Sequence, residues 1–400
     1  MPSLLLSGVL FMTAPSIVNA QQTPTNNCQW KFKTSTPFFA SPLVENNRIY
    51  IGGLDSVFYC LNLTNGEIVW TIKTGGPIRS TAKSSGEFIC FFSGDGSMYS
   101  LSKNNGAVNW KFASVDKMAD PFDYYQSSPL IHGDTLYFGS GDGNVYSINV
   151  HSGKLNWKFA TGNVVHSTPA HFNSKIYVNS FDGNTYALNA ADGQLIWKFK
   201  SIGHRYFPNG EMQFSPVVAN GLVFTSGRDY NLYALDAEKG YAHWNRVFPR
   251  GWAPVITPSP ANDSVVYIGT SDDYLVLCLN SINGRELWKA NVKFNVFGAC
   301  SFRGDTGYAS TLMGKCFSFN RKTGELLEQF TSDSYREHRL EYFKPDDTFR
   351  DDIFSILHSN EDLIEAEYKV GGFYSTPVIT GEYLLLSSTD GTLYCYSLRK

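Results

Sequence analysis

The side chains that could carry acid–base, nucleophilic or metal chemistry are scattered through this 400-residue sequence. The sequence contains no G-x-S-x-G nucleophile elbow, no H-E-x-x-H zinc helix and no glycine-rich phosphate loop. Its seven cysteines include no C-x-x-C pair and no two adjacent residues, so neither a zinc site nor a vicinal disulfide is indicated. We therefore expect no catalytic residue and no metal ligand, and the sequence favours a protein that is not an enzyme.

Aspartate recurs in tight turns of the GDG type, where it could be either a calcium ligand or a turn residue. The four examples are Asp95, Asp142, Asp182 and Asp390. An aspartate side chain accepts a hydrogen bond from the backbone two residues further on, and aspartate tolerates a left-handed backbone. We predict that these aspartates shape turns and bind no calcium.

The GDG turns lie inside a unit that returns along the chain. In residues 136–159, LYFGSGDGNVYSINVHSGKLNWKF, two runs that alternate apolar with small or polar residues flank the turn and predict a hairpin. A second turn leads to a third strand, in which Trp157 lies four residues after Gly153. The Gly–Trp spacing recurs at intervals of 40 to 47 residues, and a strand that opens with Ser-Pro or Thr-Pro precedes most units. Such a period of short strands is typical of a propeller blade.

The number of units predicts the architecture. Seven complete units begin near residues 37, 77, 124, 164, 211, 254 and 296, and an eighth begins near residue 373 but stops before its last strand. Residues 28–32, CQWKF, match that missing strand. We therefore predict an all-β, eight-bladed propeller of four-stranded antiparallel blades over residues 28–400, closed by its N-terminal strand. The repeated tryptophans are predicted to be structural: Trp30, Trp70, Trp110, Trp157, Trp197, Trp244 and Trp288. Glu328 stands at the tryptophan position of the seventh unit.

These units resemble the repeat of the pyrroloquinoline-quinone-like (PQQ-like) propeller family. The resemblance is carried by VYSINVHSGKLNW, TYALNAADGQLIW and LYALDAEKGYAHW and covers nearly all of residues 28–400. One branch of that family, the quinoprotein dehydrogenases, holds the quinone between a tryptophan and a vicinal disulfide, beside a calcium ion. Another, the periplasmic propeller protein of outer-membrane barrel assembly, carries no cofactor. The chain is nearer in plan to the second branch, so no cofactor is expected, and PQQ with calcium is expected only under the dehydrogenase alternative.

The N-terminal residues predict export. Residues 1–20 resemble a signal peptide, with an apolar run at Leu4–Met12 and small residues before a cleavage point after Ala20. No segment is apolar enough to be a transmembrane span, and no cysteine at the cleavage point could carry a lipid. We expect a soluble, monomeric protein of the periplasm or the extracellular space. A net charge of −3 gives no basic surface for nucleic acid.

Four links between units are longer than the repeat requires, and they predict a binding face. They are residues 114–125, 201–212, 245–254 and 331–371. In antiparallel blades all such links emerge on one face of the ring, where loops can vary without breaking strands. Their candidate binding residues are Phe122, Tyr124, Tyr125, His204, Arg205, Tyr206, Arg250 and Trp252, which are of the types enriched at interface hot spots. The alternative is that these side chains fold back over the blade tops.

The residues that enter the innermost strands are expected to line a central funnel. Read from the Ser-Thr-Pro-like motifs, they are Phe39, Arg79, Gln126, His166, Phe214 and Tyr374. Of these, Arg79, Gln126, His166 and Tyr374 could hold a small anion or another polar ligand. The alternative is a water-filled channel without a ligand.

The link at residues 331–371 is as long as a blade but lacks the blade motif. From Asp346 its sequence places Phe349, Ile353, Ile356 and Leu357 on one stripe, which predicts an amphipathic helix ending near Asn360. A second short helix is predicted at residues 361–368. The apolar stripe must pack either on the propeller's own surface or on another protein.

Together these features predict an exported, non-enzymatic propeller that binds a protein or peptide partner through its loop-rich face, as a scaffold in envelope or outer-membrane protein assembly. The alternative is a quinone-dependent dehydrogenase, or a propeller that binds a sugar or another small ligand in the funnel.

Overall fold

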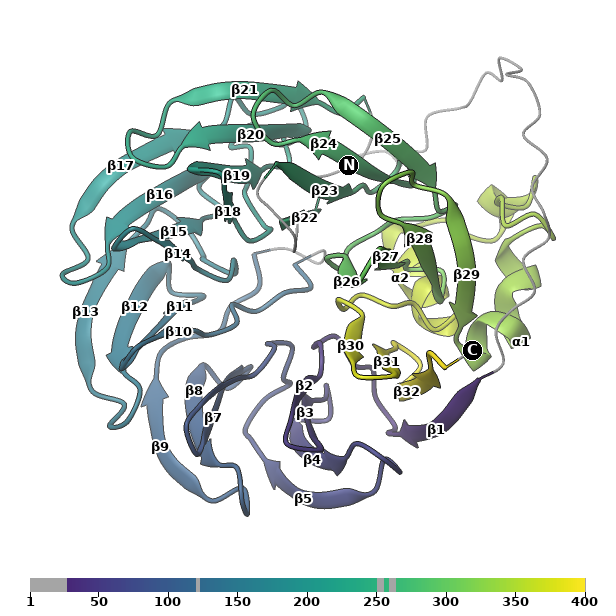
Figure 1. Ribbon diagram of the computed structural model, residues 1–400, viewed down its shortest axis with the longest axis horizontal. Coiled ribbons are helices and arrows are strands. Elements are labelled where there is room, and N and C mark those ends of the chain that lie inside the picture. Colours follow the sequence, from purple (N-terminus) through teal and green to yellow (C-terminus); the bar gives the residue numbers. More distant parts are fainter. Residues whose placement is uncertain (1–26, 120–122, 250–254, 259–263, 400) are drawn as a thin grey trace.

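The computed structural model describes residues 27–119, 123–249, 255–258 and 264–399. Eight four-stranded antiparallel sheets surround a central axis as the blades of a propeller (Figure 1). In the first seven blades the chain runs from the innermost strand outward, and then crosses to the innermost strand of the next blade. The predicted all-β, eight-bladed fold is confirmed. The predicted signal peptide, residues 1–20, lies outside the described residues.

The strands of each blade differ in length and burial according to their distance from the axis. The innermost strands are β2 (Leu43–Glu45), β6 (Lys83–Ser85), β10 (Leu130–His132), β14 (Ala170–Phe172), β18 (Val217–Ala219), β22 (Val255–Pro258), β26 (Ser301–Arg303) and β30 (Val378–Thr380). The second strands are β3 (Arg48–Gly52), β7 (Phe88–Ser93), β11 (Thr135–Gly139), β15 (Lys175–Asn179), β19 (Leu222–Ser226), β23 (Val265–Gly269), β27 (Thr306–Ser310) and β31 (Tyr383–Ser387). Most residues of the second strands are buried, because blades pack against both of their faces.

The two outer positions of the blades complete the sheets. The third strands, also largely buried, are β4 (Val57–Asn62), β8 (Ser97–Ser102), β12 (Asn144–Asn149), β16 (Asn184–Asn189), β20 (Asn231–Asp236), β24 (Leu275–Asn280), β28 (Lys315–Asn320) and β32 (Thr392–Ser397). The outer strands are β5 (Ile68–Lys73), β9 (Val108–Ala113), β13 (Leu155–Ala160), β17 (Leu195–Lys200), β21 (Ala242–Val247), β25 (Glu286–Asn291), β29 (Leu326–Thr331) and β1 (Cys28–Lys33).

The N-terminal strand closes the ring, as predicted. β1 pairs antiparallel with β32, the last strand of the chain, and Trp30 lies opposite Cys395. The eighth blade therefore has its outer strand from one end of the sequence and its other three strands from the other end. Opening the ring would expose the backbone edge of β32 to unwanted pairing.

A repeated clamp joins each blade to the next one and explains the Gly–Trp spacing. The Trp157 indole N–H donates to the carbonyl of Ala190 in the neighbouring blade at 3.0 Å. Gly193, which ends that turn with a φ of +73°, lies under the ring, and a Cβ atom there would come within 2.6 Å of it. The other six clamps repeat both features, through Trp30 and Gly66, Trp70 and Gly106, Trp110 and Gly153, Trp197 and Gly240, Trp244 and Gly284, and Trp288 and Gly324.

The clamp also explains why the seventh blade has Glu328 in place of tryptophan. A tryptophan there would need a turn between the third and the outer strand of the eighth blade. That blade takes these strands from the two ends of the chain, β32 and β1, so no turn connects them. An indole at position 328 would therefore have no turn glycine to pack on and no turn carbonyl to accept its N–H.

The repeated aspartates shape turns, as predicted. Asp142 Oδ1 accepts a hydrogen bond from the backbone N–H of Asn144, and its Oδ2 accepts one from the Tyr146 hydroxyl at 2.6 Å. The same pair of contacts recurs at Asp95, Asp182 and Asp390. The positive φ, however, belongs to the glycine that follows each aspartate. Both oxygens are thus engaged by the turn and the adjacent strand.

The long link contains helices, but not all where the sequence predicts them. α1 (Asp333–Tyr342) was not predicted, whereas α2 (Asn360–Lys369) matches the predicted second helix and begins with a capping box between Ser359 and Asp362. The predicted helix from Asp346 to Asn360 is wrong, because only a short 3₁₀ turn, η1 (Ile353–Ser355), forms there.

Local hydrogen bonds explain that failure. Asp346 Oδ1 accepts hydrogen bonds from both the backbone and the hydroxyl of Thr348, and the intervening Asp347 has a φ of +65°. Such side-chain to backbone bonds compete with a helix. The apolar residues of the predicted stripe still pack on the rest of the chain, with Phe349 against Phe294 and Phe343. The partner of the stripe is therefore the protein itself.

Candidate functional site

The links and the turns between the second and third strands share one face of the ring, here named the link face. The residue that follows each outer strand bonds to the turn of its own blade, as Thr161 N–H does to the Gly143 carbonyl. The turns between the third and outer strands, which hold the clamp glycines, lie on the opposite face. The described parts of the four lengthened links thus share one face, as the sequence predicts.

A cavity of about 180 Å³ lies where the links enter the innermost strands, at the mouth of the funnel. The predicted funnel residues all line it: Phe39, Arg79, Gln126, His166, Phe214 and Tyr374. Gln213 and Phe297 also line it but were not predicted. Gln213 is the residue two places before Ser215-Pro216, as Gln126 is before Ser128-Pro129, so counting back from each Ser-Pro would have found it.

Hydrogen bonds of Gln126 and a close contact between His166 and Asp123 hold the polar wall of this cavity in place. Gln126 accepts a bond from the backbone N–H of Arg79 at 2.8 Å and donates to Asp116 at 2.8 Å. His166 Nδ1 lies 2.7 Å from Asp123, and its Nε2 lies 3.9 Å from Asp116. His166 and Asp123 are almost fully buried. Asp116 and Asp123 belong to the lengthened link at residues 114–125. This link lies outside the repeated motif from which the funnel residues are predicted, so the motif does not indicate these two aspartates.

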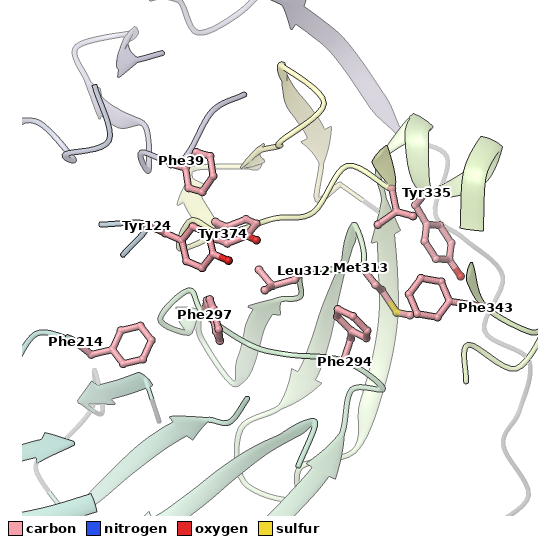
Figure 2. Packing of buried hydrophobic residues seen from close by; sticks show 11 residues of the cluster. Phe39, Tyr124, Phe214, Phe294, Phe297, Leu312, Met313, Tyr335, Phe343 and Tyr374 are labelled. Carbon is pink, nitrogen blue, oxygen red and sulfur yellow. The ribbon is translucent and has the colours of Figure 1, made fainter. Parts of the chain in front are cut away.

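Tyr124 and Tyr125, predicted for the binding face, belong instead to an aromatic cluster at the funnel mouth. Figure 2 shows Tyr124 beside Phe39 and Tyr374, with ring centroids 6.1 and 5.1 Å away. Tyr125 lines the cavity, and its hydroxyl donates to the Phe297 carbonyl at 3.0 Å. For these two residues the alternative prediction, that the side chains fold back over the blades, describes their position.

The helical insertion completes this cluster from the side of blades seven and eight. Tyr368 of α2 packs edge-on against Phe39, with 5.8 Å between the ring centroids. The neighbouring Glu367 is buried and accepts a hydrogen bond from the Tyr374 hydroxyl. Burial raises the pKa of Glu367 to about 8, so its carboxyl group is mostly protonated at neutral pH. α2 therefore places a neutral acid against the funnel wall.

Arg205 and Tyr206 form an exposed tip on the link face, and the half-buried His204 lies at its base. His204 and Phe207 exchange backbone hydrogen bonds of 2.9 Å, which makes Arg205 and Tyr206 the two residues of a tight hairpin turn. The Arg205 guanidinium lies over the Tyr206 ring, 4.5 Å from its centroid. His204 packs against Tyr230 below, with 4.4 Å between the rings. The structure therefore presents Arg205 and Tyr206 outward on a supported base.

The remaining predicted binding residues, Phe122, Arg250 and Trp252, lie outside the described residues. Within the described part of the chain, no helix is long and apolar enough to cross a membrane.

The funnel cavity does not fit the quinone and calcium of the dehydrogenase branch. Its described lining contains no tryptophan, aspartate or glutamate. All seven cysteines are free, and in the described residues no three His, Cys, Asp or Glu side chains gather as metal ligands. The cavity is also close in size to one that holds a single benzene ring, about 150 Å³, which is small for a three-ring quinone.

Comparison with known proteins identifies similar sequences and folds. The family model described as outer membrane protein assembly factor BamB matches residues 15–164 and 156–400. No curated protein matches the sequence significantly.

Several solved structures resemble this one. BamB from Moraxella catarrhalis is 14% identical with a TM-score of 0.66, and the match covers 94% of this chain and 99% of that chain. Sqt1 from Saccharomyces cerevisiae is 16% identical with a TM-score of 0.70, covering 94% and 100%. The quinohemoprotein alcohol dehydrogenase ADHIIG from Pseudomonas putida HK5 is 11% identical with a TM-score of 0.66, covering 93% and 76%. At such identities each likeness shows the fold alone.

Proposed function

The chain belongs to the family described as outer membrane protein assembly factor BamB, and from this membership we propose that it is a non-enzymatic binding scaffold. It engages a protein or peptide partner through its link face and acts in envelope or outer-membrane protein assembly. The proposal includes export to the periplasm or the extracellular space as a soluble monomer.

The Arg205–Tyr206 hairpin is the observation that carries this proposal. Tyr206 is 42% exposed, and the nearby Ile202 is 76% exposed. Tyrosine and arginine are enriched among the residues that dominate binding energies, and a rigid aromatic ring contributes contact area at low entropic cost. A stacked Arg–Tyr pair on a short hairpin is ordered before a partner arrives, which lowers the entropy lost on binding.

Other apolar side chains on the lengthened links support the same face. Val115 and Met118 in the link at residues 114–125 are exposed, as is Val247 at the end of β21. Singly exposed apolar residues are common on proteins, so each alone would mean little. Their presence on several links of one face, beside the Arg205–Tyr206 hairpin, favours that face as the interface.

Site-specific photo-crosslinking tests the proposal. A photoreactive phenylalanine analogue at position 206 should cross-link a partner in cells that export the protein. The same analogue at Gln194, an exposed residue in a turn on the opposite face, is the matched control. We expect one discrete adduct from position 206 and none from position 194. Adducts from position 194 alone would place the interface on the opposite face and contradict the proposal.

A further inference from the structure

A ring of hydroxyl groups surrounds the funnel just below the aromatic cluster. In five successive blade contacts, the backbone N–H of one Ser or Thr donates to the side-chain hydroxyl of its counterpart in the next blade, at 2.8 to 3.2 Å. Ala299 of the seventh blade donates in the same way to Thr376. The six accepting hydroxyls belong to Ser41, Thr81, Ser128, Thr168, Ser215 and Thr376, and all six line the funnel cavity.

Each of these hydroxyls is left able to donate toward the cavity. A hydroxyl group has one O–H donor and two acceptor lone pairs. The backbone N–H uses a lone pair, and none of the six O–H groups donates to a described residue. Six donors are therefore arranged around one small space.

The other polar groups of the lining strengthen this excess of donors. Gln126 and Gln213 both line the cavity, but their amide oxygens already accept bonds from the Arg79 backbone and from Arg228. Arg79 is the one lining residue in the described chain with a permanent charge. Among the described residues, its guanidinium forms no ion pair or hydrogen bond. The lining therefore favours a ligand that supplies negative charge and acceptor atoms.

The walls add a preference for a partly apolar ligand. Phe39, Phe214 and Phe297 line the cavity beside the polar groups. The volume of about 180 Å³ is slightly larger than a cavity that binds benzene, about 150 Å³. We propose that the funnel mouth is a binding site for a small organic carboxylate, whose oxygens accept from Arg79 and the hydroxyl ring while its apolar part contacts the phenylalanines.

Calorimetric titration of the full chain with benzoate, acetate and inorganic phosphate tests this site. We expect both carboxylates to bind, with benzoate tighter because its ring contacts the phenylalanines. Arg79→Gln should weaken benzoate binding by about tenfold or more, the usual effect of losing a charge-assisted hydrogen bond. Arg205→Gln, which removes an exposed arginine of the link face, should leave the affinity unchanged.

A paired substitution tests the hydroxyl ring. Thr81→Ser keeps the hydroxyl and should retain benzoate binding, whereas Thr81→Val removes it and should weaken binding by roughly threefold to tenfold. Should Thr81→Val fail to fold because the Ser41 N–H loses its acceptor, Arg79→Gln still decides the question. The proposal is overturned if neither carboxylate binds at millimolar concentration, if Arg79→Gln binds as well as the wild type, or if phosphate binds more tightly than benzoate.

Discussion

The glycine beneath each tryptophan is the residue on which a blade clamp depends. Gly193 and Gly221 have φ values of +73° and +71°, but a Cβ atom at Gly193 would meet the Trp157 ring, whereas one at Gly221 would meet nothing within 4 Å. Both substitutions by alanine carry the cost of a left-handed backbone. Gly193→Ala should cost a further 1 to 3 kcal/mol, roughly, for overpacking. Urea denaturation of the two variants measures this difference, and equal losses would show that the clamp tolerates a methyl group.

Glu367 should make the protein less stable as the pH rises, whereas a carboxylate whose pKa is lowered by folding makes a protein more stable as the pH rises. Its pKa is raised by burial to about 8 in the folded protein, against 4.5 ordinarily. Between these values the folded state keeps a proton that the unfolded state has released, so the free energy of unfolding falls as the pH rises, by at most about 1.4 kcal/mol per unit. Above pH 8 this contribution levels off.

Replacing Glu367 by glutamine should remove that dependence. The neutral amide resembles the protonated carboxyl and can still accept from the Tyr374 hydroxyl. Denaturant unfolding at pH 5, 6.5 and 8 should show a smaller loss of stability for Glu367→Gln than for the wild type. Glu365→Gln, an exposed change on the same helix, should follow the wild type. If all three proteins gave parallel curves, Glu367 would be ionised in the folded state.

Residue roles that come from the repeat could be predicted from the sequence, and those that come from irregular links could not. The tryptophans and turn aspartates stand at the same position in several units, so each unit is independent evidence for the role of that position. Asp123 and Tyr124 lie in a single lengthened link, and their burial depends on contacts with other blades and the insertion. Tyr124 was predicted as an interface residue because a buried and an exposed tyrosine look alike in a single sequence.

At the scale of elements, β1 is the strand whose loss should matter most. Deleting residues 28–34 removes the outer strand of the eighth blade and with it the Trp30 clamp to the first blade. Losing one large buried aromatic side chain costs about 3 to 5 kcal/mol; Trp30 is half-buried and its loss costs less, but the pairing with β32 is lost as well. Thermal unfolding should therefore show a larger fall in Tm for the deletion than for Trp157→Ala, which breaks one clamp and leaves the ring closed. A deletion that melts like wild type would contradict closure by β1.

The helices show where element prediction fails. The sequence does not predict α1, DSYREHRLEY, because six of its ten residues are charged or histidine. Its remaining residues form no long apolar stripe. It is nevertheless fixed in place, because Asp333 pairs with Lys31 at 2.6 Å and its N–H donates to the Tyr394 hydroxyl at 2.9 Å. The sequence predicts α2 at residues 361–368, close to its observed bounds, and the structure adds that a capping box at Ser359 marks its start. Local signals thus located one helix, and tertiary contacts determined the other.

At the scale of the whole molecule, the insertion lies beside the eighth blade, where β1 pairs with β32 and closes the ring. Figure 1 shows α1 at the rim beside β29 and β1, and α2 nearer the axis. The contact between the seventh and eighth blades has no tryptophan clamp, because Glu328 stands in place of the indole. The contacts of Asp333 with Lys31 and Tyr394 join the insertion to both strands of the closing pair. The insertion therefore reinforces the one blade contact that the repeat leaves without a clamp.

The insertion also separates the two sites proposed on the link face. α2, beside blades seven and eight, packs on the aromatic cluster at the funnel mouth through Tyr368. The Arg205–Tyr206 hairpin lies on the link between the fourth and fifth blades, away from the insertion in the order of the ring. A small ligand in the funnel and a partner on the hairpin would therefore use different residues, so that each can be tested without the other.

Because the hairpin and the funnel use different residues, changes in the hairpin should affect partner binding alone. Once cross-linking has identified the partner, Tyr206→Ala should weaken its binding by about 2 kcal/mol or more, a loss of around thirtyfold in affinity. Arg205→Ala should also weaken binding, because it removes the cation stacked on the Tyr206 ring. Both residues are exposed, so the free energy of unfolding should change by less than about 1 kcal/mol.

Two controls make this prediction specific to the link face. Gln194→Ala, on the opposite face, should leave the affinity unchanged, and Arg79→Gln, in the funnel, should leave it unchanged as well. The affinities can be measured by calorimetry with the purified partner. Equal losses from Gln194→Ala and Tyr206→Ala would mean that the partner does not distinguish the two faces, and the link face would then have no special role. A loss from Arg79→Gln alone would place the partner at the funnel mouth, where the aromatic cluster and the hydroxyl ring, and not the hairpin, would provide its contacts.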